Sequence, residues 1–226
     1  MHRIKTVIAL LIWACSFHLG AQELEYKMEI GAMAGLSSYL GDANYTNPFN
    51  HMKTGGGLMA RYNLNSRMAL KFDLAYAGIA GNTSENTNKF PGGKNWEFNS
   101  SVVDFGCQYE LHFFGYGTGE AGYKGNRRLA PYLHLGLGTT YAKGVEPEGS
   151  AFTLNIPMGF GVKYKLKPRV NVGLDWTIHF SMSDKLDGIV EPYGITGSML
   201  KNKDSYSMLM FFISYDIMPK YRKCNN

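Results

Sequence analysis

This sequence lacks any long continuous run of apolar residues beyond its first segment, and no long stretch has helical periodicity. A membrane-spanning helix needs roughly 20 consecutive apolar residues. The body of the chain therefore has no segment that could cross a bilayer as a helix, and membrane residence would have to come from strands.

Cysteine is also scarce, which argues against a fold held together by disulfide bonds. The chain has three cysteines, of which Cys15 falls in the first segment while Cys107 and Cys224 lie far apart. We expect Cys107 to be a free buried thiol rather than part of a framework of bridges.

Metal-ligand spacing is missing as well. The six histidines show no ligand pattern, and the acidic residues of the predicted loops lack the EF-hand pattern. The net charge of +5 is modest, and there is neither a nucleic-acid-binding motif nor an interleaving of aromatic and basic residues. The sequence thus predicts no cofactor, no metal and no nucleic-acid partner.

The first feature that is present is an export signal. Arg3 and Lys5 precede the apolar run Val7–Trp13, and mostly small residues follow over Ser16–Gln22. A basic start, a short apolar middle and a small-residue exit are typical of a signal peptide, so we expect residues 1–21 to be removed. A lipoprotein signal at Cys15 is the alternative, but the bulky residue two positions before it and the short apolar run argue against it.

The rest of the chain is organised around a hairpin between Phe152 and Phe180. Apolar residues alternate with small or polar ones from Phe152 to Leu166, Lys167-Pro168-Arg169 turns the chain, and the alternation resumes from Val170. A period of two sustained over this length indicates β-strands, and both arms reach the about 9–11 residues that a strand needs to cross a bilayer. Lysine and aspartate among small residues on the second face favour the interior of a small membrane barrel.

The same alternation predicts six further strands, over about residues 26–39, 57–64, 68–76, 97–113, 131–143 and 206–217. The last is apolar on both faces at first; its polar residues favour Leu209, Phe211, Ile213 and Tyr215 as the outward side. Short turns at Asn65-Ser66 and 167–169 contrast with long polar loops at 41–55, 78–95 and 181–203, whereas the connection 115–128 is long for its position.

Eight strands with short turns at one end and longer loops at the other are typical of bacterial outer-membrane barrels. The expected fold is all-β: an eight-stranded antiparallel transmembrane β-barrel over residues 22–226, ending in a short periplasmic tail from about residue 219. The expected location is the outer membrane. An exported water-soluble sandwich is the alternative, but it would not need so uniform an exposed apolar band.

The inward faces predict a charged interior. An eight-stranded barrel is just wide enough for its own side chains to fill, and confined charges are tolerated only when they are paired and hydrogen-bonded. We therefore expect a salt-bridged plug rather than a pore, and Asp175 could pair with either Lys163 or Lys71. The predicted lumen network is Glu29, Arg61, Lys71, Asp73, Asp104, Glu110, Lys163 and Asp175.

An ordered series of short motifs resembles one family. They are Tyr39-Leu40-Gly41-Asp42; Arg61-Tyr62-Asn63-Leu64-Asn65 with Arg67-Met68-Ala69-Leu70-Lys71; Pro131-Tyr132 with Gly136 and Gly138; Pro157-x-Gly159-x-Gly161-x-Lys163-Tyr164; and Asp184-Lys185-Leu186-Asp187 followed by Asp204-Ser205-Tyr206. Together they resemble the PorG-type outer-membrane proteins of the Bacteroidetes type IX secretion system. The resemblance implies a non-enzymatic barrel that docks the periplasmic ring, through its lipoprotein and that protein's partner subunit, and that serves protein secretion and gliding motility. It offers no catalytic motif.

A periplasmic ring predicts a periplasmic contact surface. Both ends of an even-stranded barrel emerge on the same side, which we expect to be the periplasmic side with the short turns. The candidate contacts are the basic residues of the 115–128 connection, the second short turn and the tail: Arg127, Arg128, Lys167, Arg169, Lys220, Arg222 and Lys223.

Two other functions are compatible with the sequence. His179, Ser181 and Asp184 cluster near the external end of their strand, where a histidine could activate a serine nucleophile in a hydrolase or acyltransferase. The long loop 181–203 could instead make the protein a surface adhesin. The sequence singles out no catalytic residue for the first reading beyond this trio.

Overall fold

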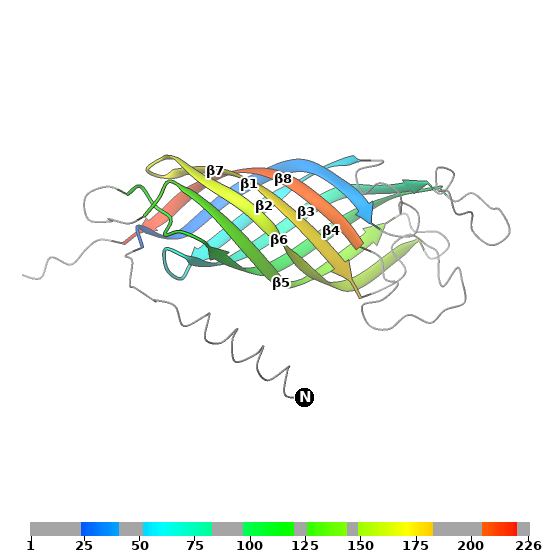
Figure 1. Ribbon diagram of the computed structural model, residues 1–226. Helices are drawn as coiled ribbons and strands as arrows, with labels where there is room; N and C mark the ends of the chain where they lie inside the picture. The colour runs from blue at the N-terminus through cyan, green and yellow to red at the C-terminus, as the bar shows by residue number, and fades with distance from the viewer. Residues whose placement is uncertain are drawn as a thin grey trace, which may run out of the picture.

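The computed structural model describes residues 24–40, 52–82, 97–119, 126–143, 149–182 and 205–220. Within these ranges the chain forms the strands β1 (Tyr26–Leu40), β2 (Lys53–Asn63), β3 (Met68–Asn82), β4 (Glu97–His112), β5 (Leu129–Lys143), β6 (Ser150–Lys167), β7 (Val170–Ser181) and β8 (Ser205–Pro219). Each strand pairs with the next, and β8 pairs antiparallel with β1 to close a barrel (Figure 1). The predicted eight-stranded antiparallel barrel is confirmed. No helix in the described part of the chain is long and apolar enough to span a membrane.

The two ends of the barrel differ. Tyr26 at the start of β1 lies opposite Pro219 at the end of β8, so β1 begins and β8 ends at the end of the barrel that carries the turns after β2, β4 and β6, on the left of Figure 1. We call this the turn end. The opposite end, where the strands are joined through residues 41–51, 83–96, 144–148 and 183–204, is the loop end.

Side chains alternate between the outer and inner surfaces of the wall, as the period of two predicts. Leu58, Leu137 and Phe152 are each at least 65% exposed on the outer surface, and most of their outward neighbours are also large apolar side chains. A continuous apolar belt of this size is not stable against water and marks a lipid-facing surface. The barrel is therefore a transmembrane one.

The ambiguous eighth strand has one clear orientation. Its outward residues are Leu209, Phe211, Ile213 and Tyr215, as predicted, while Met208, Met210 and Phe212 are buried inside the barrel. Both faces are apolar because one contacts lipid and the other packs in the interior.

Two predicted loops were too long. β2 begins at Lys53 rather than Gly57, and β3 continues through Asn82 rather than ending before Gly78. The run 54–57 and the start of the 78–95 segment are rich in glycine, which resembles loop composition. In the barrel, however, glycine allows neighbouring strands to approach closely: a Cβ at Gly57 would collide with the carbonyl oxygen of Leu74. The other strand boundaries lie within two residues of the predicted ones.

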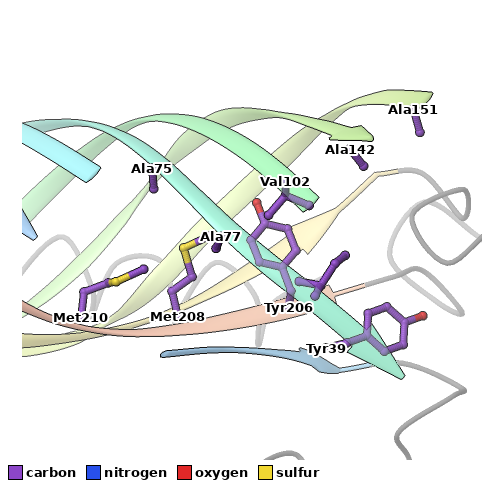
Figure 2. Packing of buried hydrophobic residues seen from close by; sticks show 10 residues of the cluster. Tyr39, Ala75, Ala77, Val102, Ala142, Ala151, Tyr206, Met208 and Met210 are labelled. Atoms are coloured by element: carbon purple, nitrogen blue, oxygen red, sulfur yellow. The ribbon is translucent and has the colours of Figure 1, made fainter. Parts of the chain in front are cut away.

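The interior near the loop end is apolar. Buried side chains from β1, β3, β4, β5, β6 and β8 form one cluster there, made of Tyr39, Ala75, Ala77, Ile79, Val102, Ala142, Ala151, Tyr206, Met208 and Met210. Figure 2 shows Tyr206, Met208 and Met210 extending from β8 into the interior. This cluster lies between the loop end and the charged side chains of the interior.

Candidate functional site: the charged interior of the barrel

All eight residues of the predicted lumen network are buried, and each is at most 5% exposed: Glu29, Arg61, Lys71, Asp73, Asp104, Glu110, Lys163 and Asp175. They come from six different strands. The strand register brings seven of them together in three groups, stacked along the barrel, and Asp73 has a separate neutral partner.

The group nearest the turn end is centred on Arg61. Its Nη1 atom lies 2.5 Å from Oε1 of Glu29, and its Nε atom lies 2.7 Å from Oε2 of Glu110. Lys163 reaches the other oxygen of Glu29 at 3.1 Å, and Ser214 donates a hydrogen bond to the same carboxylate. One arginine and one lysine thus balance two carboxylates and tie β1, β2, β4, β6 and β8 together across the lumen.

The middle group is centred on Asp175 of β7. Nζ of Lys71 lies 2.5 Å from its Oδ2, and Nε2 of His134 lies 2.9 Å from its Oδ1. Of the two lysines left open by the sequence, the structure places Lys71 beside Asp175 and Lys163 beside Glu29. The Lys163–Asp175 alternative is therefore wrong.

The third group surrounds Asp104, close to the apolar cluster. Oδ2 of Asp104 accepts hydrogen bonds from Tyr206 at 2.6 Å, Asn155 at 2.5 Å and Thr140 at 3.0 Å. The ring of His179 stacks on Tyr206 with a centroid separation of 4.5 Å, and its Nδ1 lies 3.5 Å from Oδ1 of Asp104. Neutral donors surround this carboxylate, in place of the lysine or arginine that a salt-bridged plug predicts.

Asp73 shows the same arrangement, because Gln108 donates to it at 2.8 Å. These neutral partners were not predicted from the sequence. The alternation along each strand predicts that these side chains point into the lumen. It does not predict which side chain of another strand each one contacts.

The turn end is closed by the connection between β4 and β5. Tyr116 enters the mouth of the barrel, donates to Asn171 at 2.6 Å, and lies with its ring centroid 4.0 Å from Nζ of Lys163. Burial raises the pKa of Tyr116, so its hydroxyl stays protonated as a donor. Glu25 accepts from the backbone N–H of Thr118 at 2.6 Å, which holds the connection to the start of the chain.

A further ion pair lies beneath Tyr116. Nζ of Lys165 is 2.6 Å from Oδ2 of Asp216, whose Oδ1 accepts from Asn171 at 2.8 Å. The small, partly open cavity here has a volume of about 20 Å³, which is room for about one water molecule. Lys165, Asp216 and Tyr116 were not among the residues predicted for the network.

The predicted partner residues lie at the turn end where the structure describes them. Arg127, Arg128, Lys167, Arg169 and Lys220 are all exposed there. Arg222 and Lys223 fall outside the described residues.

The serine–histidine pair of the enzyme hypothesis faces inward. His179 and Ser181 are both buried, the first against Asp104 and Tyr206, and the second with its hydroxyl 3.2 Å from that of Thr153. Asp184 lies outside the described part. This geometry places the pair among structural neighbours inside the wall rather than at an open rim.

No group of three or more histidine, cysteine or acidic side chains among the described residues is arranged to hold a metal ion. Cys107 is a half-buried free thiol on the lipid-facing side of β4. Cys224 lies beyond the described residues.

From the turn end to the loop end, the interior holds Tyr116, the Lys165–Asp216 pair, the three charged groups with the Asp73–Gln108 contact, and the apolar cluster. Removing one partner of a buried ion pair typically lowers the free energy of unfolding by about 3–5 kcal/mol. The network can therefore hold the strands in register, and the eight side chains predicted for it are at most 5% exposed.

Several solved structures are similar to this chain in outline. Neisserial surface protein A (NspA) is 15% identical over 84% of this chain and 97% of its own, with a TM-score of 0.48. The outer membrane protein OprG from Pseudomonas aeruginosa is 11% identical over 87% and 99%, with a TM-score of 0.46. A major outer membrane protein from Thermus thermophilus is 14% identical over 84% and 99%, with a TM-score of 0.45. These values are too low to carry the roles of those proteins to this chain.

No curated protein gives a significant match to this chain. A family described as "Domain of unknown function (DUF6089)" matches residues 4–215. Because this match covers nearly the whole chain, up to the last part of β8, the protein belongs to the DUF6089 family.

Proposed function

We propose that this protein is a non-enzymatic outer-membrane subunit of the type IX protein secretion machinery, which docks the periplasmic ring complex to the membrane. The observation that carries the proposal is the sealed, cross-braced interior. A barrel whose lumen is occupied by its own ion pairs is suited to act as a rigid anchor, whereas transport through it would require the network to be dismantled.

The outer membrane is the location that fits this architecture. Closed antiparallel barrels with an apolar outer belt and short turns at one end are typical of that membrane. The amino-terminal segment has the composition of a signal peptide, which would deliver the chain to the periplasm for insertion.

The motif series supports the choice of secretion system. Arg61 and Lys71, which belong to one motif, each anchor a separate group of the lumen network. Tyr132 and Gly161, from two other motifs, are cross-strand partners, and a Cβ at Gly161 would collide with the Tyr132 ring. The motifs that resemble PorG-type proteins thus contain residues that form the interior of this barrel.

The turn end is the proposed docking face. β1 begins and β8 ends there, and the exposed basic residues Arg127, Arg128, Lys167 and Arg169 lie there too. Charged side chains at the rim of an interface steer association and set its salt dependence more than its final affinity. A basic turn end would therefore favour an acidic face on the ring lipoprotein or its partner subunit, and through that contact serve secretion and gliding.

We predict that deleting residues 221–226 weakens capture of the periplasmic ring several-fold, most clearly at low ionic strength. The deletion spares Lys220, whose backbone N–H donates to the carbonyl oxygen of Glu25 and so joins the end of β8 to the start of β1. The measurement is co-purification of ring subunits with tagged barrel from outer membranes, with heat-resistant migration of the barrel as the folding check.

The matched control shortens the opposite end by removing residues from 184–203, beyond the end of β7. This variant should capture the ring as well as the unmodified chain does. If shortening the loop end abolished capture while the tail deletion had no effect, the docking face would be the loop end, and this proposal would be wrong.

A further inference from the structure

Charge is sorted between the inside and the outside of this barrel. Every acidic side chain whose burial the structure describes is buried: Glu25, Glu29, Asp73, Asp104, Glu110, Asp175 and Asp216. The exposed charged side chains of the same ranges are all basic: Lys27, Arg67, Arg127, Arg128, Lys143, Lys167, Arg169 and Lys220. All of these except Lys143 lie at the turn end, so the described surface of that end presents positive charge alone.

Two of these exposed arginines lie beside aromatic rings. The Arg127 guanidinium lies 4.3 Å from the ring centroid of Phe114. That of Arg169 lies 5.8 Å from the ring of Tyr26, and its Nη1 donates to the Tyr215 hydroxyl at 3.4 Å. These contacts hold both planar cations against the rim of the barrel wall.

The rings that contact these two arginines lie next to an aromatic girdle on the outer wall. Outward aromatic side chains gather near the turn end of the wall and are between 41% and 53% exposed: Tyr62, Tyr109, Phe113, Tyr164 and Tyr215. Such girdles lie at the level of the lipid headgroups in membrane barrels. An arginine seated beside this girdle is therefore at the depth of the lipid phosphates.

We propose that Arg127 and Arg169, with the rings of Phe114, Tyr26 and Tyr215, form a belt that binds the phosphate groups of anionic lipids in the leaflet at the turn end. A guanidinium presents a planar fork of donors that matches phosphate oxygens. The absence of any exposed acidic side chain in the described part of this end means that no carboxylate there competes with the phosphates. Because the girdle marks the headgroup level, lipid phosphates are anionic groups within reach of both guanidiniums.

This inference does not rest on the proposed secretion role, because it concerns the leaflet at the turn end whatever the barrel docks to. The test uses the full chain, folded into vesicles of phosphatidylcholine with or without phosphatidylglycerol. After mild detergent extraction, the lipids that remain bound are quantified by mass spectrometry, and the thermal midpoint is read from heat-modifiable migration.

The unmodified protein should retain phosphatidylglycerol several-fold above its share of the bilayer, and its thermal midpoint should rise with that lipid. The double variant Arg127→Gln, Arg169→Gln should retain phosphatidylglycerol in proportion to its share and lose the thermal shift. Its unchanged migration in pure phosphatidylcholine would confirm that it folds. The matched control is Lys53→Gln with Lys143→Gln, which removes two positive charges near the loop end and should keep the enrichment.

Any of four results would overturn the proposal. The belt variant could keep full enrichment, in which case the arginines do not select the lipid. The loop-end control could lose as much phosphatidylglycerol enrichment as the belt variant, which would indicate that the net charge of the protein alone attracts the lipid. Inorganic phosphate at matched ionic strength could reproduce the thermal shift in detergent, which would make the ligand a free anion rather than a membrane lipid. A belt variant that kept the lipid but lost ring capture would reassign the belt to protein docking.

Discussion

Replacing Asp175 by alanine is expected to destabilise the barrel by about 3–5 kcal/mol, because it leaves the Lys71 ammonium buried without its carboxylate. Lys71 is 2.5 Å from Asp175 and is almost wholly buried. His134, at 2.9 Å, loses its acceptor at the same time. The closed barrel should survive, since the groups around Arg61 and Asp104 do not depend on this carboxylate.

The measurement is a urea titration of the folded protein in lipid vesicles, arranged as a double-mutant cycle. Asp175→Ala combined with Lys71→Ala should cost clearly less than the sum of the single changes, since the two residues share one ion pair. Asp175→Ala combined with Lys163→Ala should be near additive, because Lys163 pairs with Glu29. Strict additivity for Lys71 together with coupling for Lys163 would show that the middle group is assembled differently.

Replacing Leu174 by arginine is expected to cost about 2–4 kcal/mol, the range for a cation introduced at the midplane of a lipid-facing strand. Leu174 is exposed on the outer wall and lies between Val162 and Phe211, which also face outward. The guanidinium would have to enter hydrocarbon in a region where the described wall offers no acidic partner.

The matched control for this change is the same substitution at a position nearer the bilayer surface. Leu166, which is just as exposed but lies near the turn at the end of β6, should tolerate arginine at a cost of about 0–1 kcal/mol, because charges near the interface reach the headgroups. The truncation Leu135→Ala should also cost less than Leu174→Arg, since it buries no charge. Equal folding free energies for Leu174→Arg and the unmodified protein would place Leu174 away from lipid.

Strict alternation explains why so much of this barrel was predictable. Once the outward residues of a strand are known, the inward ones follow from the period of two. The burial of Glu29, Arg61 and Asp175 could therefore be predicted without a structure. The eighth strand, apolar on both faces, was assigned correctly from only two polar residues, Ser214 and Asp216.

Pairing inside the lumen could not be predicted in the same way. Which lysine meets Asp175 depends on the stagger of each strand against the next around the closed barrel, and no local pattern encodes it. The neutral donors around Asp104 were missed for the same reason. Tyr116 was missed because a connection between strands has no period from which to read its direction.

The strand ends show a different limit. Gly55 and Gly57 look like loop residues by composition, yet they belong to β2 because the adjoining strands pass too close for a side chain. The same physical constraint explains the motif Pro157-x-Gly159-x-Gly161-x-Lys163, whose glycines make room for His134 and Tyr132. These motifs describe how the interior is packed.

Electrical recording from the purified barrel in planar lipid bilayers tests whether the interior is sealed. The filled lumen and the mouth closed by Tyr116 predict no stepwise conductance above that of the bare bilayer, at any voltage the bilayer withstands. Folded protein must be shown in the same sample by its heat-modifiable migration. Stable open channels that recur from one preparation to the next would show that the lumen is open.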